Sequence, residues 1–406
     1  MQPDYDILIV GGGMVGASLV CALGDSGMKV AVIEALPLSD DAQPSYDDRG
    51  LVIAPASRRI FAGIGLWPAL REGACPIEHI HVSEHGGFGI SRLEAADMGV
   101  AALGHIVIAR HIGAALLARM RALENVELLC PATVEAVSTD ASLAHVRLRQ
   151  AGDERQLRAR LLVIADGVDS AARTQLGVTV QVKDYHQSAV VANLRPEAPH
   201  RNTAYERFTR HGPLALLPLA DGRCVSVWAV HSDAVAGRLA LDDAAYLEAM
   251  GAVFGPRLGQ LEQLGRRRAY PLRLVRVRQQ HGPRFVIIGN AAHGIHPNAA
   301  QGLNLGLRDV AALAERLRDC WREDGDVGSP GLLQDYSASR TRDQHNVMRL
   351  SDGLATVFYN DLAPLCLARN LGMLVLDCLP PLKRHLIRQA MGLAGEQPRL
   401  VRGLVL

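Results

Sequence analysis

Residues 6–34 read DILIVGGGMVGASLVCALGDSGMKVAVIE, and this stretch decides the fold. The apolar run at 6–10 is typical of a buried parallel strand, and a helical pattern covers 17–25. Residues 29–33 predict a second strand, which leads directly into the acid Glu34. Together these segments predict a complete βαβ unit, the element from which parallel α/β sheets are built.

The turn between the first strand and the helix matches the pattern GxGxxG through Gly11, Gly13 and Gly16, with Met14-Val15 between the last two. The first glycine permits a tight turn, the second lets the backbone approach a pyrophosphate, and the third lets the helix pack closely on the strand. Glu34 would accept hydrogen bonds from ribose hydroxyls. In its βαβ context the pattern favours a bound dinucleotide over a glycine-rich turn without one, and it leaves FAD and NAD as alternatives.

Length and composition restrict the class of protein. The 406 residues predict two or three structural units with a large core, and 49% hydrophobic and 21% charged residues are ordinary for a globular protein. A formal net charge of +1 excludes the strongly basic surface of a nucleic-acid-binding protein. The seven cysteines show no CxxC spacing, which favours reduced thiols in the cytoplasm over a disulfide framework or a metal site. The N-terminus runs directly into a strand, so we expect no signal peptide.

A second signal lies at 161–170, LLVIADGVDS. The apolar run predicts a strand, and Asp166 follows it at the carboxyl edge, where open α/β sheets bind their ligands. Asp166 could instead cap the next helix, although Asp169 or Ser170 could equally supply that cap.

A third signal covers 285–310, FVIIGNAAHGIHPNAAQGLNLGLRDV. The pattern predicts a strand, a turn at Gly289-Asn290, a loop with His296 and Pro297, and a helix that begins near Leu303. Backbone N–H groups at a helix start attract negative charge, and Gly302 would let a flat ligand approach the main chain. His296 and Pro297 are candidates for residues beside such a ligand, and His296 is also consistent with a purely structural loop residue.

The remaining segments predict a second domain that is interleaved with the first. Alternating apolar and polar residues at 77–108 and 182–230 predict strands, 242–264 predicts a helix, and 272–279 predicts a strand that returns the chain to the third signal. We therefore predict a discontinuous nucleotide-binding domain, an interleaved β-sheet domain and a helical C-terminal region. The boundaries are 1–76, 106–180 and 272–345 for the first, 77–105 and 181–271 for the second, and 346–406 for the third.

The three signals occur in an order and spacing that resemble the single-component (class A) FAD-dependent aromatic hydroxylases. Residues 205–209, YERFT, and 212–219, GPLALLPL, resemble the substrate-domain signature of the ubiquinone-biosynthesis hydroxylases. Within that family the sequence is most similar to the branch that acts on 2-octaprenyl-6-methoxyphenol. The resemblance covers nearly the whole chain. It implies an α/β fold with an FAD-binding Rossmann-like domain of the p-hydroxybenzoate-hydroxylase type.

The resemblance also implies which residues contact FAD. Most of the wider family has Asp where this chain has Asn290, and an amide retains an acceptor while adding donors, so we expect FAD binding to survive. The implied contacts are Gly11, Gly13, Met14, Val15 and Gly16 at the pyrophosphate, Glu34 at the adenosine ribose, Val134 at the adenine through its backbone, Arg49 and Arg110 on the flavin side, Asp166 in the motif linked to FAD and the nicotinamide donor, Asn290 at the ribitol, Pro297 at the flavin face, and Gly302, Leu303 and Asn304 at the flavin pyrimidine edge.

The resemblance implies a monooxygenase in which NADPH or NADH reduces FAD, O₂ adds at flavin C4a, and the hydroperoxide transfers one oxygen atom to a polyprenylated phenol. Three alternatives stay open at this point: a hydroxylase of soluble aromatic acids, a flavin reductase or oxidase, and a non-catalytic flavoprotein subunit that scaffolds other ubiquinone-biosynthesis proteins. The basic and apolar C-terminal segment 351–406 is consistent with a peripheral contact to the cytoplasmic face of a membrane or to a protein partner, and equally with a packed helical cap.

Overall fold

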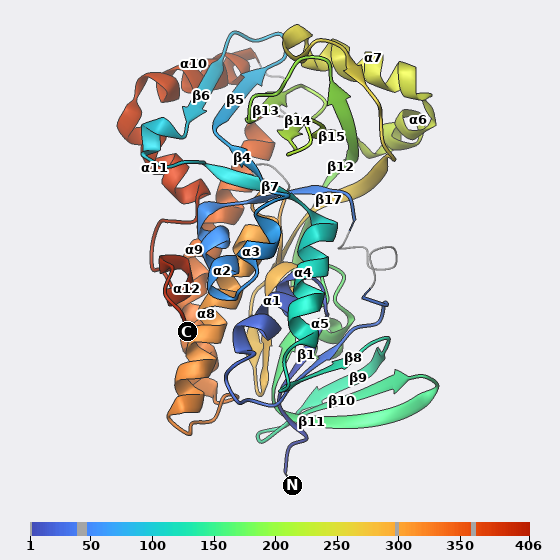
Figure 1. The fold of residues 1–406 in the computed structure, drawn as a ribbon, viewed down its shortest axis with the longest axis vertical. Helices are drawn as coiled ribbons and strands as arrows, with labels where there is room; N and C mark the ends of the chain where they lie inside the picture. The colour runs from blue at the N-terminus through green and yellow to red at the C-terminus, as the bar shows by residue number, and fades with distance from the viewer. Residues whose placement is uncertain (1, 39–46, 297–299, 359–362) are drawn as a thin grey trace.

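The computed structural model describes residues 2–38, 47–296, 300–358 and 363–406. Two large sheets are stacked along the long axis of the molecule, with a small three-stranded sheet between them (Figure 1). Helices cover the lower sheet, and the C-terminal helices run along one side of the molecule up to the upper sheet (Figure 1). This architecture confirms the predicted α/β class with a helical C-terminal region.

The lower sheet has eight strands and contains the predicted βαβ unit. Its central strand β1 pairs in parallel with both β2 and β11, and β11 pairs in parallel with β19. Residues 7–10 of β1, 30–33 of β2 and 161–164 of β11 are apolar because helices or loops bury both faces of the sheet there. In spatial order the strands are β18 (His281–Gly282), β19 (Phe285–Ile287), β11 (Asp153–Ile164), β1 (Tyr5–Val10), β2 (Val30–Ile33) and β8 (Val126–Leu129), and β10 (Ala144–Gln150) and β9 (Thr133–Thr139) extend from β11.

The upper sheet has nine strands and two different faces. The face that carries Ala189, Val191, Val225 and Leu272 packs toward the three-stranded sheet, and we call it the inner face. The outer face packs on helix α7 (Asp243–Phe254). In spatial order the strands are β20 (His293–Gly294), β17 (Arg268–Val277), β12 (Val180–Pro196), β15 (Cys224–His231), β14 (Leu214–Pro218), β13 (Thr203–Phe208), β5 (His79–Glu84) and β6 (Ile90–Glu94), and β16 (Leu261–Glu262) pairs with β12.

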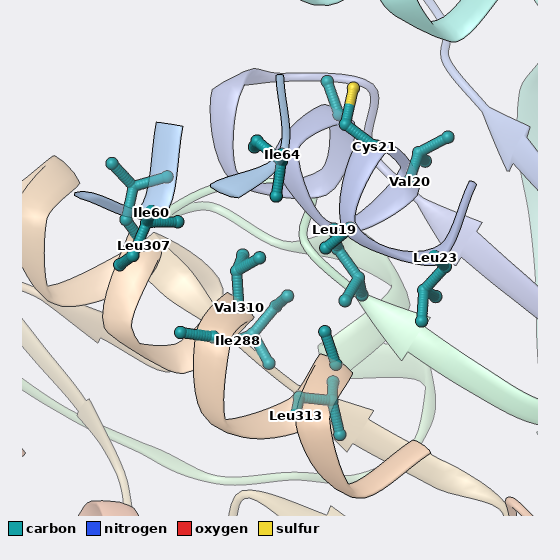
Figure 2. Close-up of a cluster of buried hydrophobic side chains, with 14 of the residues drawn as sticks. Leu19, Val20, Cys21, Leu23, Ile60, Ile64, Ile288, Leu307, Val310 and Leu313 are labelled. Atoms are coloured by element: carbon teal, nitrogen blue, oxygen red, sulfur yellow. The ribbon is translucent and has the colours of Figure 1, made fainter. Parts of the chain in front are cut away.

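Helices α1 and α8 form the core beside the lower sheet. Helix α1 follows β1 of that sheet, and α8 follows β20 of the upper sheet. Each turns an apolar face to the other, so that their contact removes large aliphatic side chains from water. The elements involved are α1 (Met14–Leu23), α2 (Pro55–Gly63), α4 (Ala109–Arg121) and α8 (Gly302–Arg322). Figure 2 shows part of this cluster, with Leu19, Leu23, Ile60, Ile64, Ile288, Leu307, Val310 and Leu313.

The small sheet and the C-terminal helices complete the chain. The three-stranded sheet has the order β3 (Gly50–Ile53), β7 (Gly104–Ile108) and β4 (Cys75–Ile77). The C-terminal helices are α9 (Pro330–Phe358), α10 (Ala363–Cys378), α11 (Pro380–Ala390) and α12 (Arg399–Arg402). Helix α9 runs through the predicted boundary between residues 345 and 346, and the division of the chain into domains stays a prediction. In the described part of the chain, no helix has both the length and the hydropathy that crossing a bilayer requires.

The predicted helix at 242–264 is only half as long as expected. It ends at Phe254 because Gly255 has φ +88° and Pro256 follows, and a proline cannot continue the helical hydrogen-bond pattern. The chain then forms β16, which the apolar pattern did not reveal.

Candidate functional site

The glycine turn after β1 packs directly against the end of β11. Gly11 has φ +106°, and a Cβ atom at this position would lie 2.5 Å from the carbonyl oxygen of Ala165. A Cβ atom on Gly16 would lie 2.0 Å from the Gly11 carbonyl oxygen, so both positions require glycine. Helix α1 begins at Met14, and its N-cap Gly13 has no side chain that could accept the first-turn N–H groups. These donors are therefore available to an anionic ligand.

Glu34 lies beside this turn, at the end of β2. Its carboxylate accepts hydrogen bonds from the backbone N–H groups of Gly12 at 2.7 Å and Leu36 at 3.0 Å. The backbone of Glu34 also accepts a hydrogen bond from Ala132 N at 2.8 Å, which brings the start of β9 and the half-buried Val134 to the same edge of the sheet. The two predicted adenosine-side residues are thus on neighbouring segments.

Asp166 follows β11 and faces the glycine turn from the opposite strand. Its Oδ2 accepts a hydrogen bond from Ala172 N at 3.3 Å, so that it does cap the short helix that follows, as does Ser170 through Arg173 N. Its Oδ1 is buried and has no hydrogen-bond partner within the described residues. An orphaned buried acceptor suits a ligand that brings hydroxyl donors, such as the ribitol chain of FAD.

The turn at Gly289-Asn290 is held by a buried polar network that the sequence did not reveal. Gly289 has φ +60° and donates its N–H to Asp309 Oδ2 at 3.1 Å. Asp309 is fully buried and also accepts hydrogen bonds from His293 Nε2 at 2.5 Å and from Arg340 Nε at 2.8 Å. Burial raises the pKa of Asp309, but the charges of His293 and Arg340 outweigh it and leave this pKa below its ordinary value. The ionised carboxylate thereby fixes the turn, and Asn290 remains exposed at its tip.

The start of helix α8 faces Asn290. A Cβ atom on Gly302 would have Ile295 Cγ1 at 3.9 Å and Asn290 Oδ1 at 4.0 Å as its nearest described neighbours, so no described residue crowds the main chain on this side. The side chain of Asn304 is already engaged, because it accepts from Ala54 N at 2.9 Å and donates to the carbonyl oxygen of Val52 at 2.8 Å. It ties α8 to β3 and leaves the first-turn N–H groups of α8, including that of the half-buried Leu303, pointing outward.

Arg49 and Arg110 lie together under the upper sheet. The Arg49 guanidinium donates to Asp47 Oδ1 at 2.8 Å, and Arg110 pairs with Asp48 at 3.0 Å. Asp47 is buried and accepts a further hydrogen bond from the Tyr270 hydroxyl of β17 at 2.5 Å. These two ion pairs hold both arginines at the junction of the two sheets.

The two histidines of the third signal have different surroundings. His293 is bound to Asp309 behind the turn, whereas His296 is buried under the ring of Tyr185, with the ring centroids 4.9 Å apart and nearly perpendicular. The carbonyl oxygen of His296 accepts a hydrogen bond from Ser351 Oγ at 3.1 Å. Pro297 lies outside the described residues.

Candidate residues from all three sequence signals lie side by side. Val15 of α1 packs against Gly289 and Gly306, which joins the starts of α1 and α8, and Gly11 lies against Asp166 on the other side. Two helix N-termini, an orphaned acceptor and an open glycine surround this region. These features fit a dinucleotide with an anionic pyrophosphate and a flat ring system, such as FAD.

Comparison with known proteins identifies the family. The model of the FAD-binding domain family matches residues 4–351 of the chain. The chain is 39% identical to ubiquinone hydroxylase UbiL of Rhodospirillum rubrum, over 99% of this chain and 93% of that protein. It is 33% identical to 3-demethoxyubiquinol 3-hydroxylase of Escherichia coli, over 97% and 99% respectively. The crystal structure of p-nitrophenol 4-monooxygenase from Pseudomonas putida superimposes with a TM-score of 0.81 at 18% identity, covering 98% of this chain and 100% of that one.

The chain therefore belongs to the FAD-binding domain family and, within it, to the class A FAD-dependent ubiquinone-biosynthesis hydroxylases. It is an FAD-dependent monooxygenase, and the family, fold class, cofactor and enzyme class expected from the sequence are confirmed.

Proposed function

We propose that this protein hydroxylates the ring of a polyprenylated phenol of the 2-octaprenyl-6-methoxyphenol type, with NAD(P)H as reductant and O₂ as oxidant. The observation that carries the proposal is the apolar inner face, which lies over the flavin-side residues. Val225 reaches Gly50 closely enough that a Cβ atom there would lie 2.6 Å from Val225 Cγ2, and Tyr185 contacts His296. An aromatic ring with a long apolar tail is the kind of substrate that such a wall accommodates.

The names of the relatives support the same substrate class. The Rhodospirillum rubrum protein is named a ubiquinone hydroxylase, and the Escherichia coli protein a 3-demethoxyubiquinol 3-hydroxylase. Both names are those of hydroxylases, and both refer to ubiquinone or its quinol, a ring that bears a polyprenyl tail.

The proposed FAD contacts are those expected from the sequence, and the geometry adds how they act. The first-turn N–H groups of α1 and α8 bind the pyrophosphate and stabilise negative charge at the pyrimidine edge of the flavin. Asn304 contributes there through its backbone, because its side chain is used to anchor α8. The chemistry supplied by bound FAD is two-electron transfer from NAD(P)H and activation of O₂. The protein supplies position and excludes water.

A labelling experiment tests the proposal. The FAD-loaded protein is incubated with NADPH or NADH, ¹⁸O₂ and 2-octaprenyl-6-methoxyphenol, and we expect one labelled oxygen atom in the ring of the product. Faster labelling of soluble aromatic acids would contradict the prenylated substrate. Oxidation of NAD(P)H without label in any product would indicate a reductase or oxidase, and absence of both reactions would indicate a scaffold subunit.

We also propose that helices α10 and α11 contact a lipid surface that carries the substrate. The four exposed apolar side chains of α10 share one side of that helix, because they are spaced by four, three and one residues, and two more follow at the start of α11. Residues 366–376 include no acid, and exposed Arg384 and Arg388 follow on α11, which suits an anionic membrane. The apolar side chains are Leu367, Leu371, Leu374, Val375, Leu379 and Leu382.

Sedimentation with liposomes of anionic and zwitterionic phospholipid tests this contact. We expect Leu371→Glu to lower the affinity for the liposomes, measured by co-sedimentation, at least tenfold. A charge then replaces a side chain that would enter the bilayer interface. Val405→Glu changes an exposed valine outside this surface and is the matched control. Equal sedimentation of wild type and both variants would contradict the lipid contact and favour a protein partner or a solvent-exposed cap.

A further inference from the structure

Strand β13 places a carboxylate in the apolar inner face. Glu206 is paired with Ala215 on β14 and with Val82 on β5, and Ala204, two residues earlier, belongs to the inner-face cluster. Side chains two residues apart on a strand, and those directly paired across strands, point to the same side. Glu206 therefore points toward the inner face, while its neighbour Tyr205 packs on Phe254 of the outer layer.

The row of side chains that contains Glu206 is otherwise uncharged near the acid. Across the sheet it continues through Ala215 to Val227 on one side and through Val82 to Ser91 on the other. Ser91 is buried, and its hydroxyl oxygen has no hydrogen-bond partner within the described residues. Two groups able to bind a polar ligand atom therefore lie two strands apart in this wall.

The surrounding charged groups are occupied with other partners. Arg207 turns away and donates to the carbonyl oxygen of Val253 at 2.8 Å, and Glu84 at the end of β5 is bound by Arg369 of α10. Asp352 of α9 accepts from the Tyr185 hydroxyl at 2.8 Å and is paired with Lys183. Strand β14 contributes no ionisable side chain.

Glu206 itself is half-buried and makes no hydrogen bond or ion pair with the described residues. Burial in these apolar surroundings raises the pKa of Glu206 to about 7. A carboxylate that lies among apolar residues without a hydrogen-bond partner lowers the stability of the folded protein. A role in binding a ligand explains why such a residue is found here.

We propose that Glu206 accepts the proton of the phenolic hydroxyl of the substrate. In this step the phenol O–H bond breaks, a new O–H bond forms on a carboxylate oxygen of Glu206, and the electron pair stays on the phenol oxygen. The resulting phenolate is richer in electrons at its ortho and para carbons, where the oxygen atom is added. The proton passes to water when the product leaves. This assignment rests on the proposed phenol hydroxylation.

The test compares Glu206→Gln, which retains the shape and removes the base, with wild type and with Tyr205→Phe on the outer face of the same strand. A general base contributes roughly 10²–10⁴-fold to a rate, so we expect Glu206→Gln to lower kcat by at least about 100-fold. Because only ionised Glu206 accepts a proton, the wild-type rate falls as the pH drops below about 7, and the variant loses this dependence. Tyr205→Phe retains both the rate and its pH dependence.

A second readout does not depend on turnover. A nitro-substituted methoxyphenol changes its visible absorption when it is deprotonated, and we expect wild type to bind it as the phenolate and Glu206→Gln to bind it as the neutral phenol. Unchanged FAD content and unchanged reduction by NADPH without phenol show that the variant is folded. A variant with the wild-type rate, pH dependence and phenolate band overturns the role of Glu206. Wild type that hydroxylates no prenylated phenol would instead overturn the proposed function.

Discussion

Replacing Glu206 with glutamine should stabilise the protein in a pH-dependent way. The carboxyl group has an ordinary pKa of 4.5, and burial raises it to about 7 in the folded protein. One pKa unit corresponds to about 1.36 kcal/mol, so the full shift corresponds to about 3 kcal/mol of the free energy of unfolding. Glu206 is only half-buried and water screens part of this energy, so we expect a gain of about 1–3 kcal/mol.

The sign of the pH dependence follows from proton uptake. Between about pH 4.5 and 7 the folded wild type binds more protons at Glu206 than the unfolded chain does. Its free energy of unfolding therefore falls as the pH rises through this window and stays lowered above it. Glutamine does not titrate, so the gain from Glu206→Gln is absent below about pH 4.5 and complete above about pH 7.

Urea unfolding of the FAD-loaded protein measures this difference. Wild type, Glu206→Gln and the control Glu262→Gln, which changes an exposed acid on β16, are compared at about pH 5 and about pH 8. We expect the midpoint of Glu206→Gln to exceed that of wild type clearly at the higher pH and only slightly at the lower one. An equal shift at both pH values would refute a buried, unpaired carboxylate, and so would a loss of stability at the higher pH.

Three further predictions concern mainly the half of the molecule that contains the lower sheet and helices α1 and α8, which we call the cofactor half. Asp309→Asn removes one of the two carboxylates that pair with the buried Arg340 and leaves only Asp343, at 2.8 Å, so we expect urea unfolding to show a loss of about 3 kcal/mol together with weaker FAD retention. Gly306→Ala places a Cβ atom 2.7 Å from an α1 side chain, so its FAD dissociation constant should rise at least tenfold by fluorescence titration, whereas Gly251→Ala, on an open helix surface, should leave it unchanged. Burial raises the pKa of the Cys21 thiol to about 12, so iodoacetamide near neutral pH should label exposed Cys378 and spare Cys21 in mass spectra.

The cofactor half could be predicted largely because its signals are local. The predicted strand at 29–33 is observed as Val30–Ile33, and the helix predicted to begin near Leu303 begins at Gly302. An apolar run, a glycine turn and a helical period each determine structure within a few neighbouring residues, so these elements can be predicted from a short stretch of sequence. The end of α7 at Gly255 is an exception, because the apolar pattern continued past the residue that ended the helix.

The contacts that hold the site together could not be predicted in the same way. Asp309, His293 and Arg340 come from three segments, and nothing in their spacing shows that one carboxylate accepts from both of the others. The structural use of the Asn304 side chain likewise depends on the backbone of β3, which is distant in the sequence. Such roles depend on which segments the fold brings together, and one chain read by itself does not specify that.

Glu206 and Asp309 show how the same chemical group takes opposite roles in one protein. Both are carboxylates that folding removes from water, and in both cases burial favours the neutral form. Asp309 is surrounded by donors and by Arg340, so its pKa falls and it serves as a fixed anchor for the flavin-side turn. Glu206 has apolar residues, Ala215 and Val82, directly opposite it on both neighbouring strands, and burial raises its pKa to about 7, where a carboxyl group can take up a proton and release it again. The acid with the lowered pKa, Asp309, stays ionised and serves a structural role. The acid with the raised pKa, Glu206, can exchange a proton near neutral pH. This difference is why we assign the proton acceptor to the inner face.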